Sequence, residues 1–413
     1  MTTRRAWLAS LVLMLGWTTL NAFAAEPAPA PPPPAAAVAP PATPLRVGVI
    51  TMLPGEEFWA RFGHDAIVIA PADDPSQAVS YNFGFFDMDE PGFIGNFIRG
   101  KMNYLLAAVP TNEDLAEYRQ QGRGVSVQWL NLSPEQAQEL ARALAINARP
   151  ENARYRYEYF TDNCTTRVRD ALDKALGGIL KAQLSGRSMG NTYRSEAVRL
   201  AWPAKWMAVG FDVGLGSYAD HPLSRWDEAF IPMRLRDSLR EVRLLDGRPL
   251  VASEAELLPH RLSMPPDELP KVQSKAFFVG LMLALAALGL GRRQPRLLAA
   301  LAIPFWLVAG LAGSVMLFIW FGTAHVAGYA NENILLLSPL SFLLLPGAWS
   351  LLRGRTPSAR FGVYLWILAG SAAIAGFLTF FPFLLQQNLD WVLLLLPLHL
   401  ALAKALSPQS QPA

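Results

Sequence analysis

Residues 154–172, RYRYEYFTDNCTTRVRDAL, join a strand pattern directly to a helix pattern. Side chains alternate in character over 154–160, which predicts a β-strand because successive strand residues point to opposite faces. Asp162 or Asn163 can cap a helix whose first turn contains Cys164. A strand that leads straight into a helix in this way is typical of an α+β domain, in which an antiparallel sheet lies beside helices.

Four further stretches before residue 133 predict strands that belong to the same sheet. They are LRVGVITML (45–53), DAIVIA (65–70), AVSYNFGFF (78–86) and GVSVQWLNL (124–132). Residues 133–148 predict a helix, with Ser133 as N-cap, Pro134 in the first position and Gln136 completing a capping box. We therefore expect one α+β domain over residues 45–273.

Cys164 is the only cysteine among 413 residues. At a helix start, unpaired backbone N–H groups and the helix dipole favour an anion, so this position should lower the pKa of the thiol. Cys164, Val168, Ala171 and Ala175 share one helix face, which predicts that the thiol faces the sheet. A lone inward cysteine is more often a packing residue than a nucleophile, so only a neighbouring base would favour catalysis.

His64 is the candidate base. It lies in FGHDAIVIA (62–70), at the entry to a predicted buried strand. An imidazole on a strand that faces a thiol can deprotonate it, although packing at a strand end is the alternative role. If strands 65–70 and 78–86 form a hairpin, residues 81–84 lie opposite His64, and Asn82 would orient the ring through its second nitrogen.

The N-terminal residues predict export. Residues 1–24 have a basic start, the apolar run AWLASLVLMLGWTTL and small residues at the end, which indicates a signal peptide; an uncleaved anchor helix is the alternative. Residues 25–44 are a tether rich in proline and alanine. An exported chain with a single cysteine has no internal disulfide, so the thiol is free.

Composition changes sharply after residue 273. Five apolar runs predict an all-α, five-span transmembrane domain over 274–413; the runs are 276–291, 297–321, 334–352, 361–385 and 391–406. The loops after the first and third runs are rich in arginine, whereas GTAHVAGYANEN (322–333) and QQNLD (386–390) contain no lysine or arginine. The positive-inside rule places the arginine-rich loops in the cytoplasm and the α+β domain outside.

Several functional classes are excluded by composition. The net charge of +3 and the lack of a basic stripe argue against nucleic-acid binding. No Cys/His cluster has the spacing of a metal site, and no Gly-rich phosphate loop occurs, so we predict neither a metal, nor a nucleotide, nor any other cofactor.

The chain has a histidine on an early strand, a polar residue on the next strand and NC at the start of a later helix. In this order it resembles the circularly permuted papain-like fold. Lecithin:retinol acyltransferase and the NlpC-type hydrolases share that plan. More closely, the chain resembles the Lnb-type lipoprotein N-acyltransferases over nearly its whole length after the tether. The matching blocks are FGHDAIVI, YNFGFFD, GKMNYLL, RGVSVQWLNLS, YFTDNCTTRVRDAL and AHVAGYANENILLLSPL.

This resemblance implies an enzyme of the bacterial inner membrane with its catalytic domain in the periplasm. It implies that Cys164 takes an acyl chain from a phospholipid as a thioester, and that the N-terminal amine of a diacylglyceryl lipoprotein then accepts it. His64 would be the base, Asn82 would orient its ring, and the backbone N–H of Cys164 could hold the oxyanion.

Further residues are candidates for substrate binding. Lys101, Tyr104 and Arg123 could meet a phosphate head group, and a solvated surface is the alternative. His325, Asn331 and Asn333 lie in an outer loop and could contact the amine or the head group, unless they form a simple interfacial loop. The two remaining histidines of the domain, His221 and His260, are expected to be solvated.

Two other functions use the same residues. A cysteine peptidase or amidase acting on cell-wall peptides would employ Cys164 and His64 in the same way, with water as the second nucleophile. A non-catalytic membrane scaffold would leave Cys164 buried and slow to react with electrophiles.

Overall fold

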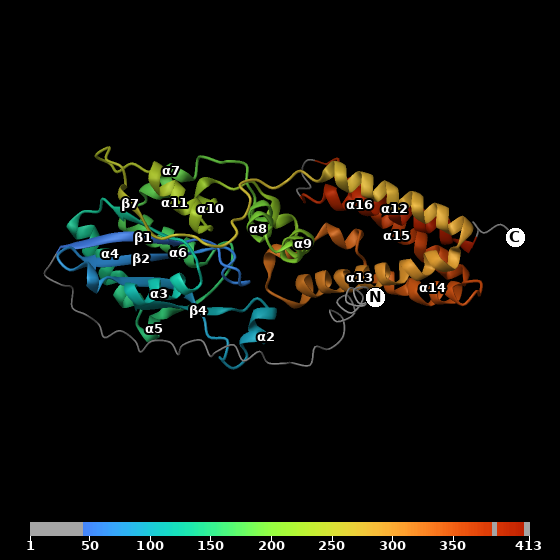
Figure 1. The fold of residues 1–413 in the computed structure, drawn as a ribbon, viewed down its shortest axis with the longest axis horizontal. Coiled ribbons are helices and arrows are strands. Elements are labelled where there is room, and N and C mark those ends of the chain that lie inside the picture. The colour runs from blue at the N-terminus through green and yellow to red at the C-terminus, as the bar shows by residue number, and fades with distance from the viewer. Residues whose placement is uncertain (1–43, 382–385, 409–413) are drawn as a thin grey trace, which may run out of the picture.

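The computed structural model describes residues 44–381 and 386–408. The predicted signal peptide and the tether up to residue 43 lie outside the described residues. An α+β domain and a helical bundle follow each other along the long axis of the molecule, as Figure 1 shows. The fold class predicted from the sequence, an antiparallel sheet with helices followed by membrane-spanning helices, is confirmed at this level.

The sheet has seven strands in the order β6-β4-β3-β2-β1-β5-β7, and every neighbouring pair is antiparallel. The strands are β1 (Leu45–Met52), β2 (His64–Pro71), β3 (Val79–Phe85), β4 (Asn103–Pro110), β5 (Val125–Leu130), β6 (Arg154–Arg156) and β7 (Val251–Leu258). The predicted strands at 45–53, 65–70, 78–86 and 124–132 are confirmed. Strands β4 and β7 are not predicted from the sequence.

The strand predicted over 154–160 is wrong in length, because β6 ends at Arg156. Glu158 turns the chain instead. Its carboxylate accepts the backbone N–H groups of Phe160 and Thr161 at 3.0 and 2.7 Å. The side chain thus takes up donors that a longer strand would have paired with a neighbour, and the chain reverses just before the cysteine helix.

Both faces of the central sheet are covered. On one face lie α4 (Pro134–Asn147), α6 (Cys164–Ala175), α7 (Ile179–Leu184) and α11 (Pro232–Glu241). Val168 and Leu172 of α6 are fully buried there, and burial of each such side chain stabilises the fold by roughly 1.5–3 kcal/mol. The other face carries α3 (Thr111–Gln120), whose Leu115 packs near Ala66 and Val68.

Shorter helices complete the domain. They are η1 (Pro75–Gln77), α2 (Phe93–Ile98), α5 (Pro150–Ala153), α8 (Tyr193–Ala201), α9 (Lys205–Gly214), η2 (Ser217–Asp220) and α10 (Arg225–Glu228). In Figure 1, α8 and α9 lie between the sheet and the bundle, and α2 projects from the sheet domain on the side that adjoins the bundle.

The bundle consists of α12 (Gln273–Arg293), α13 (Pro295–Gly322), α14 (Leu345–Leu352), α15 (Ala359–Leu378) and α16 (Leu389–Leu406). Within the described residues there are five segments long and apolar enough to span a membrane. The third is broken, because η3 (Val326–Gly328), η4 (Glu332–Leu335) and η5 (Pro339–Leu344) precede α14.

Side chains of neighbouring helices satisfy backbone groups that this break leaves free. The Ser371 hydroxyl donates to the Leu335 carbonyl at 2.9 Å, and the Nε2 atom of His399 bonds the Leu336 carbonyl at 2.9 Å. Irregular backbone is tolerated at membrane depth only where protein surrounds it, so these contacts explain why an interrupted span can persist.

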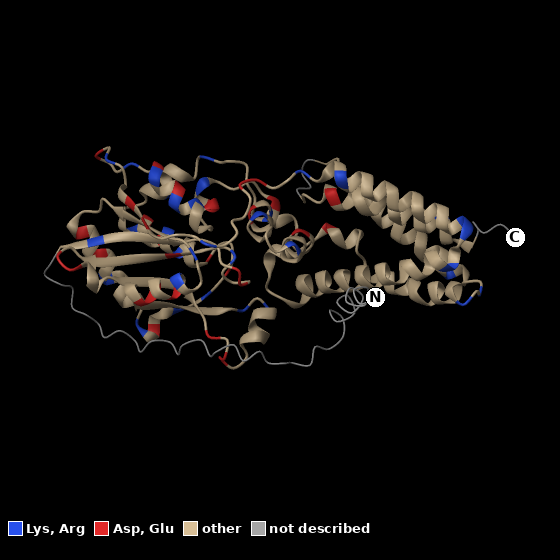
Figure 2. Ribbon diagram, viewed as in Figure 1, with Lys and Arg blue, Asp and Glu red and all other residues tan. Residues whose placement is uncertain are grey.

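Charge is distributed unevenly along the bundle. In Figure 2, Lys and Arg positions of the ribbon gather at the end of the bundle farthest from the sheet domain. Arg292 and Arg293 lie in the last turn of α12, and Arg353 follows the last residue of α14. The loops without lysine or arginine, 322–333 and 386–390, contact the sheet domain instead. This arrangement agrees with the topology expected from the positive-inside rule, with the sheet domain outside.

Candidate functional site

Strand pairing brings His64 and Asn82 together. Ala66 of β2 pairs with Asn82 of β3, so His64 is the diagonal neighbour of Asn82 on the same face of the sheet. The two side chains form a hydrogen bond, with 2.9 Å between Nε2 of His64 and Oδ1 of Asn82. The hairpin anticipated from the sequence therefore exists and joins these two residues.

The partners of Asn82 determine which nitrogen of His64 carries the proton. The Nδ2 atom of Asn82 donates to Oδ2 of Asp114 at 3.0 Å and to the Ser80 carbonyl at 3.4 Å. Both partners are acceptors, so the amide nitrogen must point toward them and Oδ1 must face the ring. Because Oδ1 can only accept, Nε2 of His64 carries the hydrogen and Nδ1 keeps its lone pair.

Cys164 is the first residue of α6, and Asn163 caps this helix. Asn163 Oδ1 accepts the Thr166 backbone N–H at 2.9 Å, and Thr166 Oγ1 accepts the Asn163 N–H at 2.8 Å. The Nδ2 atom of Asn163 also donates to the Phe230 carbonyl at 2.9 Å. Of the two caps considered from the sequence, Asn163 takes the position, while Asp162 pairs with Arg167 at 2.7 Å. The reciprocal bonds fix the direction in which the thiol leaves the backbone.

The thiol lies where the β2–β3 ladder opens. The last pair on that side is Ala66 with Asn82, and the register between β3 and β4 shifts around Gly84. Gly84 has a φ of 91°, and a Cβ atom there would lie 3.6 Å from Cβ of Cys164. Only glycine adopts this conformation without strain, and its lack of a side chain leaves room beside the thiol.

His64 and Cys164 reach this opening from different sides of the sheet. Cys164 comes from α6 and packs with the cluster on that face, whereas Asn82 and Asp114 link His64 to α3. The backbone N–H of Asp65, the residue next to His64, lies close enough to the sulfur to lower its pKa. The thiol thus lies near the start of β2, where His64 is the first residue.

Burial sets the ionisation of the pair. It raises the pKa of the Cys164 thiol above its ordinary value, while the Thr165 hydroxyl and the Asp65 N–H act in the opposite direction. Burial also lowers the pKa of His64, against the charge of Asp114 and the bond to Asn82. Both side chains are only half-buried, which limits the effect, but both directions favour a neutral thiol beside a neutral imidazole.

The lowered thiol pKa predicted from the sequence is wrong in direction. A helix start does stabilise a thiolate, but the sulfur is also desolvated in the folded domain. The backbone N–H groups do lower the pKa as expected, and burial outweighs them.

Two groups beside the thiol were not identified from the sequence. Asp65 is fully buried; its Oδ1 accepts the Thr51 hydroxyl at 2.8 Å, its Oδ2 has no partner among the described residues, and burial raises its pKa to about 7. The Tyr155 hydroxyl is also buried without a partner in the described part of the chain. A Cβ atom at Gly84 would lie 3.7 Å from the Tyr155 hydroxyl oxygen and 3.6 Å from Cβ of Cys164, so the hydroxyl is near the cysteine. A buried donor without an acceptor near a nucleophile is available to a reacting group.

Arg123 and Tyr104, both considered for head-group binding, are buried. Arg123 Nε donates to the Leu53 carbonyl at 2.8 Å, and its guanidinium lies 4.7 Å from the centre of the Tyr118 ring. Its positive charge helps to lower the pKa of His64. Tyr104 contacts Tyr157 with ring centres 4.4 Å apart. These positions give Arg123 an electrostatic role and make Tyr104 part of an aromatic wall, whereas Lys101 is exposed.

Asn331 and Asn333, considered for substrate contacts, are 3% and 1% exposed. Both donate to the Val213 carbonyl at the end of α9, at 2.7 and 3.0 Å. Their side-chain oxygens accept from Gln386 at 2.8 Å and from Asn388 at 3.1 Å. These amides are buried and already paired, so they fasten the bundle to the sheet domain, and we do not retain them as substrate ligands.

The same junction contains a buried ion pair. Arg194 Nε and Nη2 each lie 2.8 Å from the Asp220 carboxylate, which also accepts the Gln387 backbone N–H at 3.1 Å. Gly216 donates its N–H to the Ala327 carbonyl at 2.7 Å. A Cβ atom at Gly216 would lie 2.0 Å from the Tyr329 carbonyl oxygen. The sheet domain and the bundle therefore approach each other too closely here for any residue except glycine at position 216.

The remaining histidines occupy different settings. His325 bonds the Phe97 carbonyl through Nε2 at 3.0 Å and stacks on Tyr159 with ring centres 5.9 Å apart. His221 is exposed, as expected. His260 is not simply solvated, because its Nδ1 accepts the Gly124 N–H at 3.0 Å. Among the described residues no group of three or more His, Cys, Asp or Glu side chains could hold a metal ion.

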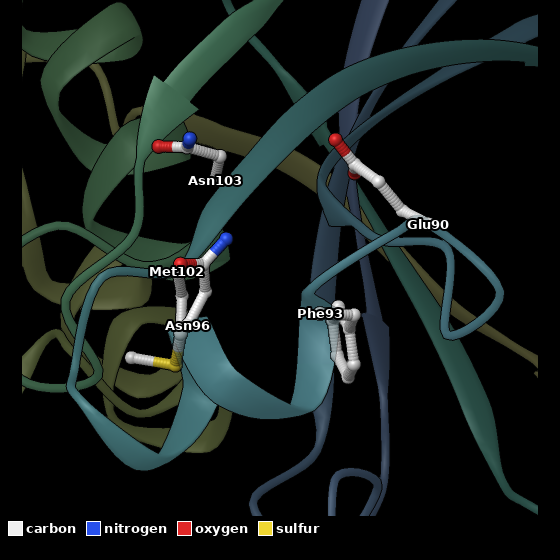
Figure 3. A pocket seen from close by; sticks show the side chains of 5 residues that line it. All are labelled: Glu90, Phe93, Asn96, Met102 and Asn103. Carbon is white, nitrogen blue, oxygen red and sulfur yellow. The ribbon is translucent and has the colours of Figure 1, made fainter.

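A small hollow of about 20 Å³ lies beside α2 rather than at the thiol (Figure 3). Its walls are formed by Glu90, Phe93, Asn96, Met102 and Asn103. This volume is close to the space that one water molecule needs, so the hollow is too small to hold a substrate.

Comparison with known families gives two matches in chain order. Residues 41–199 match the Lnb N-terminal periplasmic domain, and residues 272–408 match the Lnb transmembrane domain. The first match includes His64, Asn82, Asp114 and Cys164, and the second includes the five candidate spans. Searches of curated proteins and of solved structures found no match.

Proposed function

This chain belongs to the Lnb family as a multi-pass membrane protein with a periplasmic α+β domain, and from that premise we propose that it is a cysteine acyltransferase. Its acyl donor is a phospholipid, and its acceptor is the N-terminal amine of a diacylglyceryl lipoprotein. The observation that carries the proposal is the 2.9 Å bond from His64 Nε2 to Asn82, because it leaves Nδ1 without a hydrogen-bond partner among the described residues. The backbone N–H of Asp65, the residue next to His64, lies close to the thiol at the start of α6.

The first half-reaction forms a thioester. The sulfur of Cys164 attacks the carbonyl carbon of the lipid ester while Nδ1 of His64 takes the thiol proton. Burial raises the pKa of the thiol and lowers the pKa of the imidazole, so it favours the neutral pair as the starting state of this step. When the ester C–O bond breaks, the leaving alkoxide takes the proton from the imidazolium and departs as a lysophospholipid.

The second half-reaction transfers the acyl group. The lipoprotein amine attacks the thioester carbonyl, and Nδ1 of His64 accepts a proton from the nitrogen. The C–S bond breaks, the sulfur regains the proton, and the product is an amide. Asn82 holds the ring throughout, and Asp114 holds Asn82, which makes both of them positioning residues.

Two donors are suited to the oxyanion that develops in each half-reaction. One is the backbone N–H of Cys164 at the helix start, and the other is the unpartnered hydroxyl of Tyr155. Donors already in place when charge develops stabilise the transition state without reorganisation. The order of a strand histidine, an asparagine on the next strand and a helix cysteine also supports a circularly permuted papain-like domain over 45–273, beside a membrane domain over 274–413.

The bacterial inner membrane is the location that this reaction requires, because both substrates are held in a lipid bilayer that faces the periplasm. The junction formed by Asn331, Asn333, Arg194 and Asp220 supports the assignment, since it holds the catalytic domain against the membrane domain. A hydrolase of soluble cell-wall peptides would gain nothing from such a fixed platform.

Mass spectrometry of a lipoprotein N-terminus tests the proposal. Cells with the wild-type protein should yield an N-acylated cysteine, and cells without it, or with Cys164→Ser, should yield a free amine. An unchanged N-terminus in all three strains would refute acyl transfer. Release of free fatty acid, or cleavage of wall peptides that depends on Cys164, would indicate the hydrolase instead.

A further inference from the structure

Helix α2 exposes apolar side chains to its surroundings. It comprises six residues, FIGNFI, none of which is buried, and Ile94 is 69% exposed. Phe97 and Ile98 are exposed as well. A helix on the surface of a soluble domain usually turns its apolar residues toward the core, so an apolar helix without a buried residue requires another partner.

The exposed apolar surface continues beyond α2. Phe58 contacts Phe97 of α2 and Phe211 of α9, with ring centres 6.4 Å apart in both cases. Trp59 next to it is half exposed and contacts Phe86, with ring centres 6.2 Å apart. We define the apolar rim as Trp59, Ile94, Phe97 and Ile98.

Hydrogen bonds place α2 at the outer end of a membrane span. The Ala324 N–H, just after α13 ends at Gly322, donates to the Arg99 carbonyl at 2.8 Å. His325 bonds Phe97 as described above. Trp320 and Phe321, in the last turn of α13, are exposed. Aromatic residues at the end of a span are enriched at the membrane–water interface, so α2 is joined to the chain at the level of that interface.

Positive charge follows the helix at once. Arg99 and Lys101 are exposed and come directly after the apolar residues of α2. Apolar side chains next to cations are the pattern of elements that lie in a bilayer interface, where the apolar part enters the acyl region and the cations meet lipid phosphates. The exposure of Lys101 fits the head-group contact considered from the sequence.

We propose that α2 and the rest of the apolar rim insert into the outward-facing leaflet of the bilayer, with phospholipid as the occupant of this surface. The rim then adds a monotopic attachment to the five spans. The continuity of α2 with the end of α13 and the cations beside it favour a lipid surface over another protein.

A row of aromatic rings connects this surface with the thiol. Phe93 of α2 stacks on Phe86 at 5.5 Å, Phe86 stacks on Tyr104 at 4.9 Å, and Tyr104 contacts Tyr157 at 4.4 Å between ring centres. A Cβ atom at Gly84 would lie 3.6 Å from the Tyr157 ring and 3.6 Å from Cβ of Cys164, so this ring is near the cysteine. This row guides an acyl chain from the leaflet to the sulfur, a part of the inference that rests on the proposed function.

Insertion can be measured without any acyl transfer. Since Cys164 is the only cysteine, Cys164→Ser combined with Ile94→Cys gives one labelling site for a polarity-sensitive fluorophore. Leu245→Cys in the same background is the control, because Leu245 is 93% exposed in a turn before β7. Both proteins are reconstituted at full length in vesicles of phosphatidylethanolamine and phosphatidylglycerol.

A nitroxide carried on the lipid chain should quench the label at position 94 several-fold more strongly than the label at position 245. Iodide in the water should show the reverse order. Equal quenching at the two positions by both agents would overturn insertion, as would quenching at position 94 by iodide alone.

The route along the aromatic row is tested separately with Ile94→Asp and Ile98→Asp in a chain that keeps Cys164. Acyl transfer should fall about tenfold or more, because the cost of placing a charge in the acyl region opposes seating of α2. Alkylation of Cys164 by a small soluble electrophile should stay unchanged, and Leu245→Asp should keep both activities. Normal transfer in the double variant would overturn the route. If no variant and no wild type acylates lipoproteins, the proposed function fails, whereas the quenching result still decides insertion.

Discussion

Two buried polar clusters in this molecule have similar residues and opposite properties. At the junction, the amide nitrogen and the amide oxygen of both Asn331 and Asn333 have protein partners. Among the side-chain amides of this cluster, only Asn388 Oδ1 lacks a partner within the described residues. In the sheet domain, the hydrogen bonds from Asp114 through Asn82 end at His64, whose Nδ1 has no partner in the described part of the chain. A cluster whose bonds close on themselves holds structure, whereas one that ends beside a thiol can move a proton.

The comparison shows that residue type does not distinguish the two roles. An asparagine orients a base in one cluster and fastens two domains in the other, and only the partners of its amide tell them apart. Four substitutions test this distinction, from the largest expected effect to the smallest.

Replacing the nucleophile should have the largest effect. Cys164→Ser should lower acyl transfer by about 10⁴-fold or more, because a hydroxyl is a much weaker nucleophile than a thiol in this setting. Thermal unfolding of the full-length protein in detergent should stay near that of the wild type. Near-normal transfer by the serine variant would show that the open-ended cluster is not the catalytic one.

Removing the base should come next. His64→Ala should slow thioester formation by roughly 10²–10⁴-fold, the usual contribution of a positioned proton acceptor. In the wild type, transfer should be lost as the imidazole is protonated, at a pH below the ordinary histidine value of 6.5 because burial lowers the pKa of His64. His260→Ala is the matched control, since this ring is also partly buried in the same domain. The loss of activity at low pH is the acid limb of the pH profile. An acid limb that is absent in His260→Ala and still present in His64→Ala would contradict the assignment.

Asp114→Asn should have a smaller effect with a distinctive signature. Transfer should fall by about tenfold, as the ring of His64 is held less firmly. The negative charge of Asp114 raises the pKa of His64, so its removal should move the acid limb to lower pH. Glu117→Gln, an exposed change on the same helix, should leave both the rate and the limb unchanged. A lower rate with an unshifted limb would reduce Asp114 to a merely structural residue.

The junction variant Asn333→Ala should change stability and leave the chemistry intact. It leaves the Asn388 amide without its acceptor in a buried setting, which costs about 1–3 kcal/mol. Thermal unfolding of the full-length protein should report this loss, while the pH profile and the alkylation of Cys164 stay as in the wild type. Loss of transfer at unchanged stability would return Asn333 to the role of a substrate ligand and remove the contrast between the clusters.

Much of the sheet could be predicted from the sequence, because buried strands such as β1 and β2 are continuous apolar runs. The edge strand β7 escaped detection, since its sequence, VASEAELL, is mostly exposed and partly acidic. The length of β6 was misjudged because alternation continues past Arg156, whereas the Glu158 side chain ends the strand.

Within the site, Asn82 followed from hairpin pairing, which a short turn largely determines. Asp114, Asp65 and Tyr155 could not be found in this way. Asp114 reaches Asn82 across 32 positions, and a partner at that separation depends on how a helix packs on the sheet. The sign of the thiol pKa failed for the same reason, since desolvation is a property of the packed domain. The outer loop carried no signal that distinguishes a substrate contact from a domain contact.

The close approach at Gly216 has a consequence for selectivity under the proposed function. Because the sheet domain is fixed to the bundle, the sulfur is held at one distance from the bilayer. The protein would then select an ester by the depth of its carbonyl carbon, and the size of the head group would matter less. The acceptor amine must rise to the same level, which its own lipid anchor ensures. Selection by depth makes the anchor, rather than the sequence of the attached protein, the feature that marks an acceptor.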